Sequence, residues 1–420
     1  MPSGLVPVRP GYCGVTSSGA AGDSSKERTG AIGVSKDVQL DIPVEYDYRG
    51  LSTDVEAEEE EPQDGTIHEP FDPAKIDVQT RTMTVGLLLA RLRRGVLDLA
   101  PDFQRFAGIW SEAAQSRLIE SVLLRIPLPN LYAAEVGEES WAIVDGIQRL
   151  TTIARFVEPE VIGMPPLRLT GLEYLSSYEG YTYADLASGL KTRIDETEMV
   201  VHLIRAGTPE PVKFNIFGRI NTGGRPLTLQ ELRHALIPGR ARTLLAELAG
   251  SDPFLQATLH SVKPDRMADR EMALRFLAFR LTEPKDYPRG DLDLFLRQAM
   301  KRLNTLEPEA IERLKDDFAR AMWAARDIFE EHAFRKRFPG QHRRLPVNKA
   351  LFEAVSVNLA KMTSQEIDAL REGRDMVQAR FAALMEDNKF HQAISVATGD
   401  GKKVRRRFGA VEELFREIAR

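Results

Sequence analysis

The sequence predicts an α/β domain followed by a mainly α-helical domain, with an acidic leader before both. From about residue 75 to 165, short apolar runs bounded by turn residues alternate with segments whose apolar residues recur at helical spacing. From about 241 to 385 the apolar period stays near 3.6 residues, and strand signals are few. We therefore expect a flexible acidic leader over 1–74, an α/β domain over 75–165 and a helical domain over 166–420.

Helix start signals divide the α/β domain into its elements. Thr84 is placed to cap a helix over residues 85–94. Ser111 is placed to cap a second helix, which Pro127 stops. The strands that we expect lie at residues 76–79, 131–134 and 141–144.

The helical domain shows similar signals. Apolar residues at four-residue spacing predict a helix that ends at residues 221–224, where two glycines let the chain turn. Thr228 and Glu231 have the spacing of a capping box, which predicts a helix over 229–235. A last strong helix is expected over 411–419.

Composition limits the classes of protein to which this chain can belong. Its 420 residues are 43% hydrophobic and 28% charged, as in ordinary globular proteins. The longest apolar runs are far shorter than the ~20 residues that span a bilayer, and the N-terminus lacks the pattern of a secretory signal. The single cysteine, Cys13, excludes an intramolecular disulfide and a cysteine-based zinc site. We expect a cytoplasmic protein.

Charge is distributed unevenly, although the net charge is only -5. Between Arg49 and Lys75 acidic residues crowd a stretch without lysine or arginine. Such a block is usually disordered and solvated; the alternative is a segment that mimics nucleic acid and occupies a basic groove. Two basic clusters come late in the chain: Arg335, Lys336, Arg337, Arg343, Arg344 and Lys349, and then Lys402, Lys403, Arg405, Arg406 and Arg407. They either contact a DNA phosphate backbone or form ordinary solvated surface.

The loop after the strand at 141–144 is the most informative stretch. An Asp-Gly turn, Asp145 and Gly146, leads into an amphipathic helix whose first turn carries Gln148 and Arg149. Backbone N–H groups and the positive end of the helix dipole meet at such a helix start, which predicts an anion site with phosphate as the candidate. The alternative is ordinary turn chemistry followed by threonines that only cap the helix.

Four short motifs then occur in the order found in one family of prokaryotic proteins. They are Phe103-Gln104-Arg105 with Trp110; Leu118-Ile119-Glu120-Ser121 with Ile126-Pro127 and Pro129; Asp145-Gly146-Ile147-Gln148-Arg149; and Asn221-Thr222-Gly223 with Pro226-Leu227-Thr228 and Gln230-Glu231-Leu232-Arg233. Over roughly residues 75–240 the chain resembles the N-terminal domain of GmrSD-type restriction proteins, a domain with an Asp-Gly-Gln-Gln-Arg motif. The resemblance implies a fold of the ParB and sulfiredoxin-like superfamily for the α/β domain.

The resemblance implies nucleotide binding at this loop, with Asp145, Gln148 and Arg149 as the catalytic group. Arg149 would neutralise phosphate charge, and Asp145 would hold a Mg²⁺ ion or polarise a water molecule. The NTP would also contact groups from the loop, the following helix and two distant motifs: Gln104, Arg105, Gly146, Thr151, Thr152, Arg219, Asn221 and Arg225. The structural alternative is an internal Arg–Asp network that only pins the loop.

One position departs from the family pattern, since Ile147 replaces the first glutamine of the loop. A side-chain amide that could orient a phosphate or a water molecule is therefore missing. We expect binding to survive more readily than turnover. Positioning a water needs a polar group within ~3 Å, whereas backbone amides and one arginine can still hold a phosphate.

The favoured hypothesis is a nucleotide-binding, DNA-associated component of a restriction or phage-defence system, with NTP hydrolysis as an activity that the resemblance implies. The competing hypothesis is a non-enzymatic DNA-binding or scaffolding protein whose loop recognises backbone phosphate; nuclease activity of the ParB-like domain is a third, less favoured one. Expected partners are a nucleotide, DNA at the C-terminal basic clusters, and a separate nuclease or ATPase subunit. Cleavage by this chain alone is not expected, because His332, His342 and Asn348 lack a carboxylate at ligand spacing.

Overall fold

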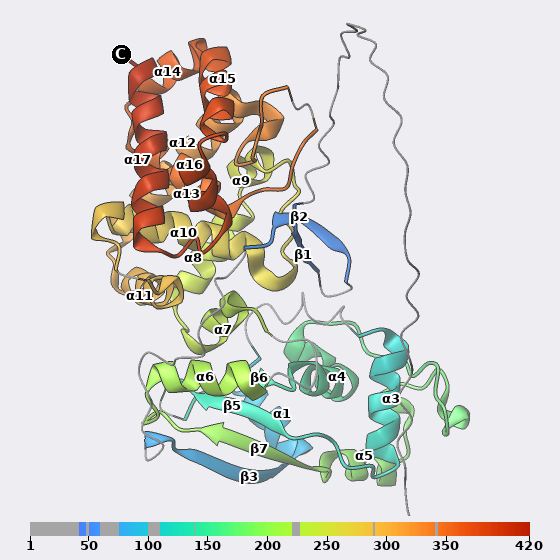
Figure 1. Ribbon diagram of the computed structural model, residues 1–420. Helices are drawn as coiled ribbons and strands as arrows, with labels where there is room; N and C mark the ends of the chain where they lie inside the picture. Colours follow the sequence, from blue (N-terminus) through green and yellow to red (C-terminus); the bar gives the residue numbers. More distant parts are fainter. Residues whose placement is uncertain are drawn as a thin grey trace, which may run out of the picture. The chain divides into compact units, whose positions relative to one another are not determined.

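A mixed sheet of five strands forms the framework of the α/β part (Figure 1). The computed structural model describes residues 42–47, 50–58, 75–99, 110–137, 139–220, 227–288, 290–340 and 343–420. The strand order is β3 (Val78–Thr84), β7 (Glu198–Ile204), β5 (Leu131–Glu135), β6 (Trp141–Asp145) and β4 (Leu97–Asp98). The β3–β7 and β5–β6 pairs are antiparallel, whereas β5–β7 and β4–β6 are parallel.

Helices cover both faces of this sheet. One face carries α1 (Val85–Arg93), α3 (Glu112–Leu123), α4 (Ile147–Val157) and α5 (Ser188–Asp195), which share a buried apolar cluster with alternate residues of β5, β6 and β7. The intervening residues Ala134, Val144 and Ile204 point to the other face and join the apolar core of the helical part. The central strands are therefore apolar on both sides, as expected for strands between two layers.

The start signals of the helices are confirmed. The Thr84 side chain accepts a hydrogen bond from Leu87 N, and Ser111 accepts one from Ala114 N. Thr228 and Glu231 form the predicted capping box, with which α7 (Leu229–Leu236) begins. The expected strands at 131–134 and 141–144 match β5 and β6, whereas the strand expected at 76–79 starts two residues later and runs on to Thr84 as β3.

The sheet of the α/β part extends past residue 165, where we expect the domain boundary. β7 lies between β3 and β5 in the sheet, although it follows a long stretch of short turns and the helix α5. Its side chains alternate, with Met199, Val201 and Leu203 facing α1, α3 and α4. The α/β part therefore includes a strand that we had assigned to the helical domain.

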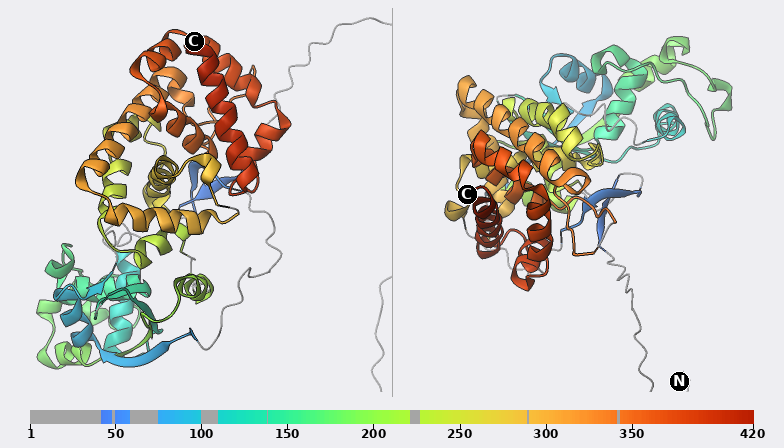
Figure 2. Two further views of the ribbon diagram at one scale, coloured as in Figure 1. Left: turned by 90° about the vertical axis from the view of Figure 1, so that its left-hand side faces the viewer. Right: turned by 90° about the horizontal axis from the view of Figure 1, so that it is seen from above.

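The chain after β7 is mainly helical (Figure 2). The helices are α6 (Glu210–Ile220), α7, α8 (Arg240–Ala249), α9 (Asp252–Ala257), α10 (Ala268–Leu281), α11 (Leu292–Thr305), α12 (Pro308–Phe329), α13 (Lys349–Lys361), α14 (Ser364–Glu372), α15 (Arg374–Leu384), α16 (Asn388–Ser395) and α17 (Gly401–Ile418). Of the helices described, none has the length and apolar character that a bilayer crossing needs. α17 starts ten residues before the helix expected at 411–419, because its charged first turns hid the apolar stripe that starts at Val404.

The leader contains a hairpin, which differs from the flexible segment that we expected. β1 (Val44–Tyr46) pairs with β2 (Ser52–Glu56), and Val55 of β2 is fully buried. Glu56 N donates to Val347 O at 2.8 Å, and Val347 N donates to Asp54 O at 2.7 Å, so β2 is joined to the helical part. The hairpin could not be recognised from its acidic composition, because the residues that neutralise its charges are distant in the sequence.

Candidate functional site

Gly146 gives the turn between β6 and α4 its shape. Its φ is +91°, in the left-handed region that favours glycine, and it is the N-cap residue of α4. A Cβ atom at this position would lie 2.2 Å from Leu131 Cδ2. Because glycine has no side-chain acceptor, the N-cap residue itself does not cap the first turn of α4.

Arg149 folds back over this helix start. Its Nη2 donates to Asp145 Oδ2 at 3.0 Å, and its Nη1 donates to Pro129 O at 2.6 Å. The Arg149 side chain is 11% exposed, whereas that of Asp145 is 35% exposed. This contact is the internal Arg–Asp pair that the sequence left open as the structural alternative. It engages two of the five N–H donors of a guanidinium group and fixes the plane of the others.

The remaining residues of the predicted loop face in different directions. Gln148 is half-buried, and Ile147 packs against the apolar cluster beneath the sheet. Thr151 and Thr152 lie on the buried side of α4, with exposed fractions of 3% and 2%. Among the described residues, the Thr151 hydroxyl has no hydrogen-bond partner. The two hydroxyls therefore lie below the helix start, and their contact with an anion stays a prediction.

The more distant predicted ligands are placed only in part. Arg219 is exposed near the end of α6. Gln104, Arg105, Asn221 and Arg225 lie outside the described residues. The structure therefore brings together Asp145, Gly146, Gln148 and Arg149, and leaves the contribution of the other motifs as a prediction.

The segment before β5 supplies groups that the sequence did not single out. Pro129 provides the carbonyl for Arg149, and the next residue, Asn130, lies 3.0 Å from His202 Nε2 through its Nδ2 atom. His202 also lies 3.0 Å from Thr80 Oγ1 through Nδ1, and its ring packs on Tyr132. The Pro129 position was part of the family pattern, but its carbonyl could not be recognised as a partner of Arg149 from spacing alone.

Asp145 is the expected metal ligand. Within the described part of the chain, no group of three or more His, Cys, Asp or Glu side chains is arranged to hold a metal ion. One carboxylate is still compatible with Mg²⁺, which proteins often hold through one or two carboxylates while substrate phosphates and water complete the shell. A role for Asp145 as a Mg²⁺ ligand stays a prediction.

The α/β part also contains a buried carboxylate with a structural role. Glu120 of α3, in the Leu-Ile-Glu-Ser motif, accepts hydrogen bonds from the amides of Glu173, Tyr174 and Leu175 at 2.7–3.0 Å. Burial alone would raise the pKa of Glu120, but these amides hold it below its ordinary value. This motif therefore fixes a loop beside the sheet.

The two basic clusters are much less exposed than the sequence suggested. In the first, Arg335, Lys336 and Lys349 are buried and only Arg343 and Arg344 are exposed. In the second, Lys402, Arg405 and Arg406 are exposed on α17, while Arg407 is fully buried against Glu353. Much of the charge that could contact DNA is thus engaged inside the protein.

The histidine group also has a structural explanation. Asn348 caps α13, since its side chain accepts a hydrogen bond from Leu351 N at 2.8 Å, and its amide donates to Ile394 O. His332 is buried, and burial lowers its pKa. His342 lies outside the described residues.

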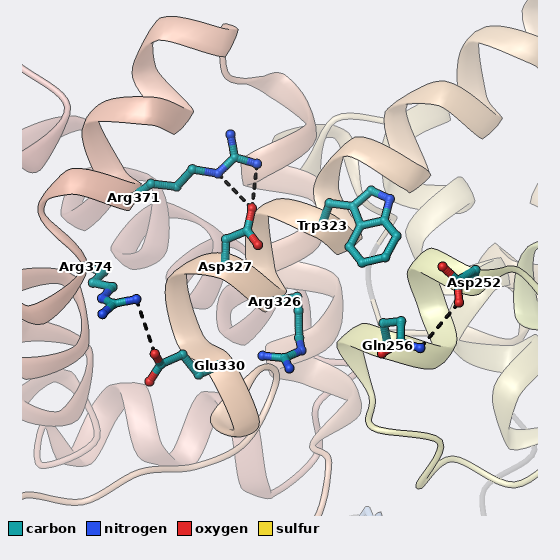
Figure 3. Close-up of a pocket in the computed structure, with 8 residues that line it drawn as sticks. All are labelled: Asp252, Gln256, Trp323, Arg326, Asp327, Glu330, Arg371 and Arg374. Carbon is teal, nitrogen blue, oxygen red and sulfur yellow. Dashed lines mark hydrogen bonds and ion pairs between the residues drawn. The ribbon is translucent and has the colours of Figure 1, made fainter.

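An open hollow of about 550 Å³ lies in the helical part, and none of the predicted site residues that the structure describes lines it (Figure 3). Its walls come from α9, α12, α14, α15 and the residue after α12: Asp252, Gln256, Trp323, Arg326, Asp327, Glu330, Arg371 and Arg374. Arg371 pairs with Asp327 at 2.7 Å, and Arg374 pairs with Glu330 at 3.3 Å. Most of its charges are therefore compensated within its own walls.

Comparison with known proteins bears on the α/β part. Residues 85–238 match the family model of the GmrSD restriction endonuclease, N-terminal domain. The chain therefore contains a GmrSD-type N-terminal domain. The matched residues include β5, β6, α4 and the capping box of α7, and hence the turn with Arg149. No curated protein and no solved structure matches the chain. The match points to a component of a restriction or phage-defence system.

Proposed function

We propose that the protein is a nucleotide-binding, DNA-associated component of a cytoplasmic restriction or phage-defence system, and that nucleotide phosphates bind where β6 leads into α4. The observation that carries the proposal is the start of α4 at a glycine, with the Arg149 guanidinium held over it. Backbone amides, the helix dipole and a guanidinium together form the usual chemistry of a phosphate site. A separate nuclease or ATPase subunit would act with it.

Arg149 would act as a pre-oriented phosphate ligand. Asp145 and Pro129 O fix its guanidinium plane, which reduces the entropy lost when the other donors meet a phosphate. A Mg²⁺ ion that arrives with the NTP would contact the outer oxygen of Asp145, and Gln148 would orient a water for hydrolysis. Leu131 lies against Gly146, so phosphate would approach from the Gln148 side.

Calorimetric titration of ATP, GTP, CTP and UTP, each with and without Mg²⁺, tests the binding step. Arg149→Ala should weaken the Kd of the preferred nucleotide by at least tenfold, because one charge-assisted contact contributes about 1.5–3 kcal/mol. The matched control is Arg93→Ala, which removes an exposed arginine from another helix. Absence of binding by the wild type, or equal loss in both variants, would refute the nucleotide site.

Hydrolysis has its own test at Ile147. The variant Ile147→Gln restores the amide of the family motif, and we expect it to increase the rate of phosphate release. Nucleotide affinity should change little, because Arg149 and the helix amides are retained. An unchanged or lower rate, measured at saturating NTP, would contradict the role assigned to the missing amide.

The competing function is a DNA-binding or scaffolding protein. It is compatible with the same geometry, because the Arg149 guanidinium over the start of α4 could contact a backbone phosphate of DNA as readily as a nucleotide phosphate. In that case Arg149→Ala would abolish binding of a labelled duplex while no nucleotide binds the wild type. Nucleotide binding that depends on Arg149 would exclude this function for the loop.

A further inference from the structure

The N-terminal hairpin presents a row of carboxylates to the helical part. We call β1, β2 and residues 57–58 the acidic hairpin. Its carboxylates occupy alternate positions along the chain, at Asp54, Glu56 and Glu58. In an extended chain, side chains at alternate positions point to the same side, and their Cα atoms are ~6.7 Å apart. Glu45 of β1 adds a fourth carboxylate. Such a row repeats negative charge along a chain in the manner of a phosphate backbone.

Each of these carboxylates is paired with a cation far away in the sequence. Asp54 contacts Arg335 at 2.7 Å and Arg344 at 3.7 Å. The other pairs are Glu56 with Lys336 at 2.6 Å, Glu58 with Arg275 at 3.0 Å and Glu45 with Lys349 at 2.6 Å. We call Arg275, Arg335, Lys336, Arg344 and Lys349 the cation cluster.

The helical part cannot neutralise the cation cluster alone. Its own carboxylates in contact with the cluster, among the described residues, are Glu271 and Glu353, and Glu353 is also shared with Arg407. Removal of the acidic hairpin would take away the carboxylate partners that Arg335, Lys336 and Arg344 have among the described residues. Such a cluster has a strong affinity for a polyanion.

Apolar contacts hold the hairpin only weakly. Val55 is the one fully buried apolar side chain in its described residues, while Tyr46 and Leu51 are 58% and 59% exposed. Beyond that, two backbone hydrogen bonds with Val347 attach β2. Contacts that consist mainly of charge pairs can be exchanged for another anion of matching charge, unlike a large apolar interface.

We propose that the acidic hairpin is a displaceable cover on a nucleic-acid-binding surface, in which its carboxylates occupy the places of backbone phosphates. Nucleic acid and hairpin compete for the cation cluster, so free protein binds DNA weakly and displacement of the hairpin activates binding. This inference deepens the DNA-binding part of the proposed function and does not depend on the nucleotide site at Arg149.

The test neutralises the row in the full chain with Asp54→Asn, Glu56→Gln and Glu58→Gln. Fluorescence anisotropy with a labelled 20-nucleotide single strand should show at least tenfold tighter binding. The slope of log K against log salt should steepen by ~2, since about three cations are freed and each contributes ~0.7. The control has the same change in charge at exposed positions: Glu309→Gln, Glu372→Gln and Asp375→Asn. Equal affinity in the two variants would overturn the proposal.

Hydrogen exchange of the wild type gives a test that does not need a stable variant. Saturating single strand should speed exchange of the Glu56 and Val347 amides, whose hydrogen bonds join the hairpin to the helical part. Bound single strand with unchanged or slower exchange at both amides would overturn the proposal. Nucleotide titration of the neutralised variant reports separately on the Arg149 site, so failure of one proposal leaves the other intact.

Discussion

Two arginines in similar surroundings have different capacities to meet a ligand. Arg149 in the α/β part pairs with Asp145, four residues earlier on the same segment. Arg275 in the helical part pairs with Glu271, also four residues earlier, but in addition with Glu58 and Glu353 from distant segments. A local pair leaves donors of the guanidinium available, whereas carboxylates from three segments saturate it. Arg149 can therefore meet a ligand directly, whereas Arg275 can do so only after Glu58 has been displaced.

The saturated network extends through the helical part. Glu271 also contacts Arg233 at 3.6 Å and Lys349 at 3.4 Å. Burial alone would lower the pKa of Arg275, but its three carboxylate neighbours raise it well above the ordinary value. Burial would raise the pKa of Glu271, whereas Lys349, Arg275 and Arg233 lower it. Such mutual compensation lets charges remain ionised at burial levels that an isolated charge could not tolerate.

The largest expected effect is the removal of Arg275. Arg275→Ala leaves Glu58, Glu271 and Glu353 close together without their shared cation, which should cost about 3–5 kcal/mol of unfolding free energy. Urea denaturation followed by circular dichroism measures it. The matched control is Arg280→Ala on the same helix, where a partly exposed pair with Asp317 should cost about 1 kcal/mol. Similar losses in both variants would mean that the network is not cooperative.

The second effect concerns the turn that positions Arg149. Gly146→Ala combines a left-handed backbone with a Cβ that meets Leu131 Cδ2, so we expect a loss of about 2–4 kcal/mol. The control is Gly180→Ala, which has a φ of +80° but open space around its Cβ position. It should cost only the backbone part, about 1–2 kcal/mol. Equal thermal shifts in the two variants would show that Leu131 readily moves aside.

Elements with local signals could be predicted from the sequence. Thr84, Ser111 and the Thr228–Glu231 box each fix a helix start through hydrogen bonds within three residues, so the information lies in adjacent positions. β7 and the acidic hairpin depend on partners far along the chain, and neither the sheet order nor the ion pairs are encoded in spacing. The hairpin was therefore expected to be flexible, because Glu56 and Glu58 are compensated only in three dimensions.

The candidate site shows the same division. The order of strand, Asp-Gly turn and helix placed Asp145, Gly146 and Arg149 together, as predicted. The Pro129 carbonyl that orients Arg149 could not be predicted, because Pro129 lies 20 residues earlier in the chain, just before β5. Thr151 and Thr152, which were also expected to contact the ligand, are buried on α4, and their contact with a ligand stays a prediction.

A third prediction measures how firmly the local pair is held. Arg149→Ala should cost about 1–2 kcal/mol of unfolding free energy, since it removes hydrogen bonds to Asp145 and to Pro129 O at a largely buried position. Arg149→Lys should recover part of the stability but not the nucleotide affinity. An ammonium group lacks the planar set of donors with which a guanidinium can contact Asp145, Pro129 O and a phosphate together. A loss as large as that of Arg275→Ala would remove the contrast between the two arginines.

The smallest effects should appear in the pH dependence of two neighbouring hairpin carboxylates. Burial raises the pKa of Glu56 above its ordinary value, against the opposing effect of Lys336. Burial would also raise the pKa of Glu58, but Arg275 and Lys349 lower it. A lowered carboxyl pKa adds stability above the ordinary value near 4.5, and this stability is lost as the pH falls through the folded-state pKa. A raised pKa has the opposite sign, because the ionised form is disfavoured in the folded state.

Denaturation of Glu56→Gln and Glu58→Gln from pH 7 down to about pH 2.5, which extends below the ordinary carboxyl pKa, separates the two signs. The stability advantage of wild type over Glu58→Gln should shrink as the pH falls, since the wild-type carboxylate takes up a proton and loses its attraction to Arg275. The advantage over Glu56→Gln should grow over the same interval, because protonation relieves the cost of burying that charge. Parallel pH profiles would show that both carboxylates share one environment, and that the hairpin's charges are not individually matched to the cations opposite them.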